Sequence, residues 1–218
     1  VAAPGGHGGY PHLSANPIKI MAAIITALET LHGRKPVLPE AVERALGTPE
    51  AIAATERGMG TGAAEVVRML TVNTGTIEGG TKINTIPHRC VLEVDLRIPI
   101  GLDRDAILAE VTSLVASHPG ATLDMLEAHS YQPSMADPEH EMVRIIQANV
   151  QALIGVTPLP LCSLGGSDSR YWRYRGVPAY LYGPSPVSMG RADEHVTIDE
   201  FLHVVKVHAL SAWDYLSA

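Results

Sequence analysis

The chain has 218 residues, of which 46% are hydrophobic, and a formal net charge of -7 with 16 lysines and arginines. This hydrophobic content is sufficient for a packed core and excludes a disordered chain. The acidic balance, without a clustered basic face, argues against a nucleic-acid partner. The longest apolar stretch, MAAIITAL at 21–28, is far shorter than the ~20 residues of a membrane span, and no charged-then-apolar leader opens the chain. We therefore expect a soluble, cytoplasmic protein with no membrane partner.

Cys90 and Cys162 are too few and too far apart for a disulfide framework or a Cys-rich zinc site, and we expect them to be small buried hydrophobic residues.

The first predicted element is a helix over residues 17–32. Asn16 and Pro17 form a cap and first-turn pair. Apolar residues then recur at helical spacing up to Gly33, namely Met21, Ile24, Ile25, Leu28 and Leu31. Residues 35–62 are rich in Pro, Ala and Gly, and we expect them to be irregular apart from a short helix at 40–46.

Two strands and a second helix follow. Residues 69–80 are rich in Thr and β-branched residues and end in Gly-Gly, which is typical of a strand that runs into a turn. Apolar residues alternate with charged ones from Cys90 to Ile98, the period of a strand with one solvated face. We expect these two strands to pair antiparallel. Asp103 then caps a helix to about Ala116, with an apolar stripe of Leu102, Ile107, Val111, Leu114 and Val115, and residues 121–128 predict a further strand.

The order helix, strand, strand, helix, strand is a split βαβ pattern without its first strand, which we expect before residue 1. After Ser130 the pattern predicts a helix at 138–154, a strand at 158–162, a helix from about 168, a strand at 178–182 and a helix at 197–215. This alternation favours a parallel α/β sheet, but two short strands cannot cover three helices. On architecture alone, we therefore expect both halves of the chain to depend on an N-terminal segment outside these residues.

Three loops carry the candidate functional residues. In GGHGGYPH (5–12), glycines on both sides of His7 allow close approach of the backbone to a ligand; the alternative is a flexible loop with a surface His. In LGGSDSRYW (164–172), Gly166 and Ser167 precede a helix N-terminus, which favours an anion. Arg170 adds a bidentate group for a carboxylate; the alternative is an ordinary capped helix with a surface Arg.

The third loop, GPSPVSMGRADEH, ends at His195, just before Thr197 and Glu200, which form a capping-box pair. A lone loop His is more often a surface residue than a metal ligand. Catalytic zinc takes about three protein ligands, and the chain contains no HExxH, His-x-Asp or adjacent Glu-Glu motif. Spacing alone thus provides one candidate ligand. The chain also has no Gly-x-Ser-x-Gly elbow and no Walker loop, which argues against a serine nucleophile and nucleotide hydrolysis.

Taken in order, GGHGGYPHLSANPI, GGTKINTIPHRCVLEVDLRIP, GGSDSRYWRYRGVPAYLYGP and ADEHVTIDEF resemble the carboxyl-terminal half of one family. This is the family of dinuclear-zinc amidohydrolases and metallopeptidases that includes acetylornithine deacetylase, succinyl-diaminopimelate desuccinylase, aminoacylase and glutamate carboxypeptidase. The resemblance implies an α/β protein with an α+β lid. Residues 1–127 would form a split βαβ, ferredoxin-like lid or dimerisation domain, and residues 128–218 an incomplete, returning part of the α/β catalytic domain.

The resemblance also implies residue roles. His7 matches a lid His that reaches into a partner subunit's site and stabilises the oxyanion, and Asn84, in the Asn-x-Ile-Pro motif, matches a residue that helps to hold the substrate. Gly166, Ser167 and Arg170 match the segment that receives the substrate's carboxylate, and His195 matches the last metal ligand.

The chain departs from this family because it lacks the ligands and the general base that precede the lid. The resemblance implies two divalent metal ions, zinc first and manganese or cobalt as alternatives, with most ligands outside the chain. It implies as partners the N-terminal half of the catalytic domain, a second copy bound through the lid, and a small carboxylate-bearing substrate. We therefore expect a fragment of a metal-dependent hydrolase of amide or related C–N bonds, inactive alone. The alternatives are a non-enzymatic dimerisation or carboxylate-binding module and, third, a metal-free α/β binding protein.

Overall fold

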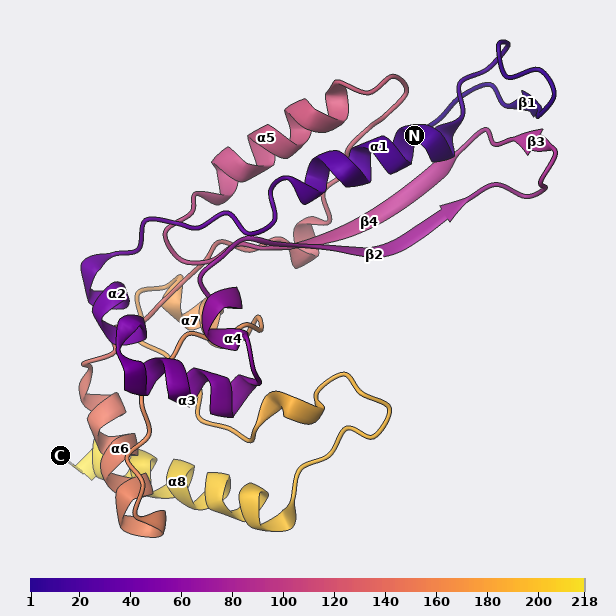
Figure 1. Ribbon diagram of the computed structural model, residues 1–218. Coiled ribbons are helices and arrows are strands. Elements are labelled where there is room, and N and C mark those ends of the chain that lie inside the picture. Colours follow the sequence, from indigo (N-terminus) through magenta and orange to yellow (C-terminus); the bar gives the residue numbers. More distant parts are fainter. Residues whose placement is uncertain (218) are drawn as a thin grey trace. The chain divides into compact units, whose positions relative to one another are not determined.

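The computed structural model describes residues 1–217 (Figure 1). The chain folds into two compact units. Unit 1 comprises Val1–Val37 and Arg68–Pro133, and unit 2 comprises Leu38–Val67 and Ser134–Ala218. This division differs from the expected domains at 1–127 and 128–218, because residues 38–67 join the later part of the chain. The domain assignment stays a prediction.

Two helices of unit 1 form where periodicity and caps predict them. Helix α1 (Pro17–Glu29) begins at Asn16, whose side chain accepts a hydrogen bond from the Ile18 N–H. Helix α5 (Arg104–Ala116) begins at Asp103, whose carboxylate accepts from the Asp105 and Ala106 N–H groups. Each cap satisfies donors that the first turn of a helix leaves without a partner.

The expected antiparallel pair of strands is confirmed. Strand β2 (Thr71–Gly79) pairs with β4 (Cys90–Arg97), with a register shift between Thr74 and Thr76. Helices α1 and α5 lie along one side of this ladder (Figure 1). The two expected helical stripes and the apolar face of β4 meet there in one core, whose buried members are Met21, Ile24, Leu28, Leu31, Leu70, Val72, Cys90, Ile107, Val111 and Val115.

Unit 1 also corrects one expectation. The predicted strand at 121–128 is wrong, because residues 127–129 form a 3₁₀ turn, η1 (Glu127–His129), and the segment before it has no ladder partner among the described residues. A strand needs a partner for its backbone groups, and apolar alternation cannot supply one. The first residues of the chain lie beside the start of β4 instead: Ala2 bridges to Arg89, and the Ala2 N–H donates to the Gly120 carbonyl at 2.9 Å.

Unit 2 begins with helices that were only partly expected. Helix α2 (Glu40–Gly47) is confirmed, but the expectation that the rest of 35–62 is irregular is wrong. Helix α3 (Pro49–Met59) begins at Thr48, whose hydroxyl accepts from the Ala51 N–H at 3.1 Å, and a short helix α4 (Ala63–Val66) follows. Thr48 and Pro49 repeat the cap and first-turn pair that predicted α1.

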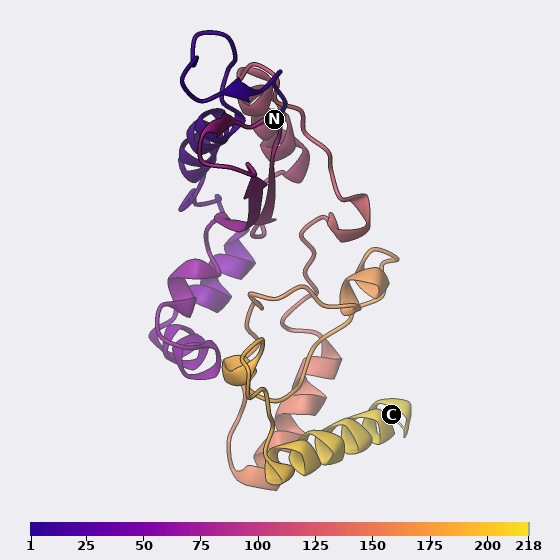
Figure 2. The ribbon, with the colours of Figure 1, turned by 90° about the vertical axis from the view of Figure 1, so that its right-hand side faces the viewer.

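The remainder of unit 2 is helical with irregular connections. It contains α6 (Glu141–Ile154), α7 (Ser169–Arg173), a 3₁₀ turn η2 (Pro186–Ser188) and α8 (Ile198–Ser217). Helices α6 and α8 pack together (Figure 2), and the Asn149 amide donates to Asp214 at 2.9 Å. The predicted strands at 158–162 and 178–182 are wrong, since the described part of unit 2 contains no strand. Within residues 1–217, no helix is long and apolar enough to cross a membrane.

The fold class therefore combines helices with small antiparallel sheets, as expected for an α+β lid. Cys90 is buried as expected, Cys162 is half-buried, and both are free thiols.

Candidate functional site

A short ladder brings His7 and Asn84 together in unit 1. Strand β1 (Gly6–His7) pairs with β3 (Thr85–Ile86), with His7 opposite Thr85, and the Gly8 N–H donates to the Asn84 carbonyl at 2.8 Å. Figure 1 shows both strands at the end of unit 1, beyond the β2–β4 ladder. A Cβ at Gly8 would lie 3.1 Å from the Asn84 carbonyl oxygen, so the glycine permits this close approach. Both expected lid residues are exposed here.

The His7 side chain is held by its own loop. The Gly9 N–H donates to His7 Nδ1 at 3.1 Å, and the Tyr10 N–H donates to the His7 carbonyl at 2.9 Å. The Tyr10 ring lies tilted against the imidazole, with 5.7 Å between ring centroids. The Gly5 N–H donates to Ser14 Oγ at 3.0 Å and ties the loop to the start of α1. The loop therefore orients an exposed imidazole whose Nδ1 is already engaged.

In unit 2, Ser167 belongs to a chain of hydrogen bonds. Its hydroxyl lies 2.6 Å from Ser169 Oγ and accepts from the Ser169 N–H at 3.1 Å. Ser169 Oγ accepts from Arg173 Nη1 at 2.9 Å. Arg173 also donates to Ser134 Oγ at 3.0 Å and to the Ala179 carbonyl at 2.9 Å. Arg173 thus fixes the segment that contains Ser167.

Arg170 lies in the same segment and is largely covered. Its side chain is 14% exposed, and its guanidinium lies 3.6 Å from the Asp168 carboxylate and 4.6 Å from the centre of the Tyr171 ring. Helix α7 has five residues, and Asp168 makes no side-chain capping bond to it. The expected anion site at this helix start therefore has a weaker helix dipole than the sequence implied. The carboxylate-binding role of Gly166, Ser167 and Arg170 stays a prediction.

His195 lies in the loop before α8. Ser188 Oγ donates to the His195 carbonyl at 2.8 Å and accepts from the His195 N–H at 3.3 Å. His195 Nδ1 lies 2.7 Å from the Asp193 carbonyl oxygen, and the side chain is 64% exposed. In the described residues, these bonds stay within residues 188–195, so the structure does not join His195 to the Ser167–Arg170 segment.

One of the two hydrogen bonds of the predicted capping box at α8 forms. Thr197 Oγ1 accepts from the Glu200 N–H at 3.2 Å, but the Glu200 carboxylate accepts from the Ser185 N–H at 2.7 Å. The second bond of the box is thus replaced by one that fixes the loop ahead of His195.

The described residues provide only part of the ligand set that a metal ion needs. No group of three or more His, Cys, Asp and Glu that could hold a metal occurs within residues 1–217. His195 fits as a single ligand, because its ring is exposed and Nδ1 is bonded to its own loop, which leaves Nε2 available.

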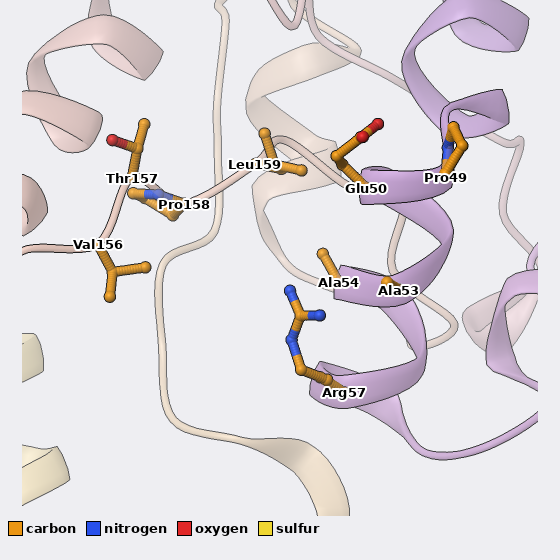
Figure 3. A pocket seen from close by; sticks show the side chains of 9 residues that line it. All are labelled: Pro49, Glu50, Ala53, Ala54, Arg57, Val156, Thr157, Pro158 and Leu159. Atoms are coloured by element: carbon orange, nitrogen blue, oxygen red, sulfur yellow. The ribbon is translucent and has the colours of Figure 1, made fainter.

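A pocket of about 440 Å³ lies elsewhere in unit 2 (Figure 3). It is lined by residues 156–159 and by one side of α3, which contributes Glu50 and Arg57. None of the expected site residues lines it, and its one carboxylate and one guanidinium define no preference for a charged ligand.

Sequence reasoning missed three supporting residues: Gly9, Asp193 and Arg173. Gly9 and Asp193 act through backbone groups, which leave no residue-type signal. Arg173 lies four residues after Ser169, and this i, i+4 spacing could have suggested the contact.

Comparisons with known proteins agree with the sequence motifs. Residues 1–122 match the family described as peptidase dimerisation domain. A succinyl-diaminopimelate desuccinylase from Cereibacter sphaeroides is 24% identical over 215 residues, which covers 97% of this chain and 49% of that relative. A succinyl-diaminopimelate desuccinylase from Ruegeria pomeroyi is 26% identical over 204 residues, which covers 92% of this chain and 46% of that relative. The chain thus spans about half the length of the curated relatives it matches.

Among solved structures, an M20 family metallo-carboxypeptidase from Sulfolobus solfataricus superimposes with a TM-score of 0.69 at 16% identity. The match covers 95% of this chain and 54% of that protein, and at this identity the likeness concerns the fold.

Proposed function

The chain belongs to the peptidase dimerisation domain family of the M20 peptidases, and from this we propose that it supplies the lid and carboxyl-terminal part of a cytoplasmic, metal-dependent hydrolase. The proposed reaction is cleavage of an amide or related C–N bond in a small carboxylate-bearing substrate, such as an N-acyl amino acid or a peptide. The observation that carries the proposal is the exposed pair of His7 and Asn84, which the β1–β3 ladder assembles from distant parts of the sequence.

Each residue has a proposed role. His7 donates a hydrogen bond to the oxygen that becomes negative in the tetrahedral transition state, and Asn84 helps to hold the substrate. Gly166, Ser167 and Arg170 receive the substrate's carboxylate. His195 contributes one imidazole ligand to a site for two divalent ions, zinc first, with manganese or cobalt as alternatives. A divalent ion bound there would supply Lewis-acid activation of the attacking water.

We further propose that this chain is inactive alone and that a second polypeptide segment provides the remaining ligands and the general base. The support is the share of each relative that the chain covers, 49% and 46%. Large apolar side chains exposed on α8 support the same idea, because soluble proteins rarely leave such a patch uncovered. These include Ile198, Phe201, Trp213 and Leu216.

A homodimer formed through unit 1 is part of the proposal. The description of the matching family supports it, and so does β2, which has β4 as its one neighbour in the described ladder and a free edge on its other side. Free strand edges offer unpaired N–H and C=O groups to another chain.

The second candidate function is a non-enzymatic module that dimerises or binds a carboxylate. The independent core of unit 1 favours it, since that unit buries its apolar residues without help from unit 2. It predicts dimerisation or carboxylate binding without metal and without hydrolysis.

Native and denaturing mass spectrometry of the purified protein, with metal analysis and assays on N-succinyl and N-acetyl amino acids, tests the proposal. We expect a companion polypeptide of comparable size, about two metal ions per pair, and hydrolysis that a chelator abolishes. A lone 23.2 kDa chain without stoichiometric metal or hydrolysis would instead support the binding module.

A further inference from the structure

We infer that two backbone groups fix opposite neutral tautomers of His7 and His195, so that Nε2 carries a proton in the first ring and a lone pair in the second. The chemical meaning of this difference rests on the proposed function. The tautomers themselves are properties of this chain and can be measured without metal or substrate.

The His7 tautomer follows from its contact with Gly9. A backbone N–H can only donate, so His7 Nδ1, 3.1 Å from the Gly9 nitrogen, must accept. A neutral imidazole has one N–H and one acceptor nitrogen, and the proton of His7 therefore lies on Nε2. The ring is exposed, and its Nε2–H is a hydrogen-bond donor toward an anionic oxygen without prior protonation. In this tautomer Nε2 offers no lone pair to a metal.

The His195 tautomer is the reverse. The Asp193 carbonyl oxygen can only accept, so His195 Nδ1, 2.7 Å away, must donate. Nε2 then has the free lone pair. The Ser188 hydroxyl bonds to both the carbonyl and the N–H of His195. These two bonds fix the His195 backbone and so help to keep its ring close to the Asp193 carbonyl. An imidazole that donates its second N–H to a backbone carbonyl is the usual arrangement of a metal-ligating His.

Gly9 is therefore a positioning residue that acts through His7, and the Asp193 carbonyl has the equivalent role at His195. Residue type and spacing alone do not distinguish the two histidines, since both lie in glycine-containing loops. The direction of a single backbone hydrogen bond separates a hydrogen-bond donor from a metal ligand.

Two-bond ¹H–¹⁵N spectra of the imidazole rings in the ¹⁵N-labelled chain, recorded at about pH 9 where imidazole is neutral, test the inference. We expect the Nε2–H pattern for His7 and the Nδ1–H pattern for His195, each assigned by its His→Gln variant. The chain contains two internal references. His32 Nδ1 accepts from the Val72 N–H and His140 Nδ1 accepts from the Met142 N–H, each at 3.2 Å, so both rings should give the Nε2–H pattern. The same tautomer at His7 and His195, or averaged shifts at either ring, would overturn the inference.

A pair of variants in the complete protein gives a second readout. Gln places its amide nitrogen about as far from Cα as Nε2, whereas Asn places it near Nδ1. We expect His7→Gln to keep a kcat roughly tenfold or more above that of His7→Asn, because one well-placed donor contributes on this scale. Equal losses would count against a donor at Nε2. If the wild-type protein hydrolyses nothing, the proposed function fails while the spectra still decide the tautomers.

Discussion

At the residue scale, His195 provides the direct test of the proposed metal role. His195→Ala removes the imidazole proposed as a metal ligand, so the complete protein should bind about one metal ion fewer per subunit. Elemental analysis after gel filtration measures this. His12→Ala, which removes an exposed loop His of unit 1, is the matched control and should leave the metal content unchanged. An unchanged metal content in His195→Ala would exclude this ligand.

A second residue-scale prediction concerns Gly79, which faces Cys90 across the β2–β4 ladder. A Cβ at Gly79 would lie 2.9 Å from Cys90 Sγ and 3.2 Å from Cys90 Cβ, and Cys90 is 1% exposed and packs in the core of unit 1. Gly79→Ala should therefore lower the free energy of unfolding by about 1–3 kcal/mol.

Urea denaturation measures the effect, and Gly58→Ala is the control. Gly58 lies in α3, and apart from its chain neighbours and the helix's own backbone no atom lies within 4 Å of the position that an added methyl group would occupy, so this change should stabilise the helix by about 0.5–1 kcal/mol. Equal effects of the two variants would contradict the proposed contact with Cys90.

At the element scale, Arg173 should determine how firmly α7 is held. Arg173→Met removes its hydrogen bonds to Ser134, Ser169 and Ala179, and hydrogen bonds from a charged group contribute about 1.5–3 kcal/mol each before compensation. We expect faster amide exchange across α7 and a loss of stability of about 2 kcal/mol. Arg175→Met, an exposed position just after the same helix, should change neither quantity.

The ion pair between Arg34 and Glu110 predicts a pH dependence for the attachment of α5. The guanidinium donates to both carboxylate oxygens, at 2.6 and 2.8 Å, and this hydrogen bonding holds the pKa of Glu110 below its ordinary value. The folded state therefore binds its proton less readily than the unfolded state. The ion pair therefore stabilises the fold fully above the pKa that Glu110 has in the unfolded chain. This stabilisation is lost as pH falls through the lower pKa that Glu110 has in the folded chain.

Glu110→Gln should accordingly destabilise the protein by about 0.5 kcal/mol at neutral pH, because both side chains are more than a third exposed and solvent screens the pair. The difference from wild type should shrink and then disappear as pH falls through the lowered folded pKa of Glu110, and Glu29→Gln on α1 is the control. Denaturation at several pH values measures it, and a difference that persists in acid would contradict the role of the charge.

Local patterns predicted the elements whose signals are local. Helices α1 and α5 and the β2–β4 pair follow from caps, stripes and alternation. The strands expected at 121–128, 158–162 and 178–182 are absent from the described chain because ladder partners are not encoded locally. The β1–β3 ladder has two residues on each side, too few to leave any period, so the meeting of His7 with Asn84 could not be predicted from spacing. Their roles came from family resemblance alone.

At the scale of the whole molecule, the two units differ in how their apolar residues are buried. Unit 1 encloses a continuous core between α1, α5 and the β2–β4 ladder. Unit 2 buries single positions such as Val143, Val150 and Val207, while α8 leaves Phe201, Trp213 and Leu216 exposed at 56%, 71% and 82%. Regions with few buried apolar contacts open at lower free energy.

We therefore expect the isolated chain to exchange its amides unevenly. Hydrogen–deuterium exchange with mass spectrometry should show slow exchange in β2, β4 and α1 and fast exchange in α6 and α8. If a second polypeptide covers α8 in the complete protein, protection there should rise by tenfold or more, since roughly 1.4 kcal/mol of added local stability gives that factor. Equal protection of both units in the isolated chain would mean that unit 2 is stable without a partner, and the exposed face of α8 would then no longer support one.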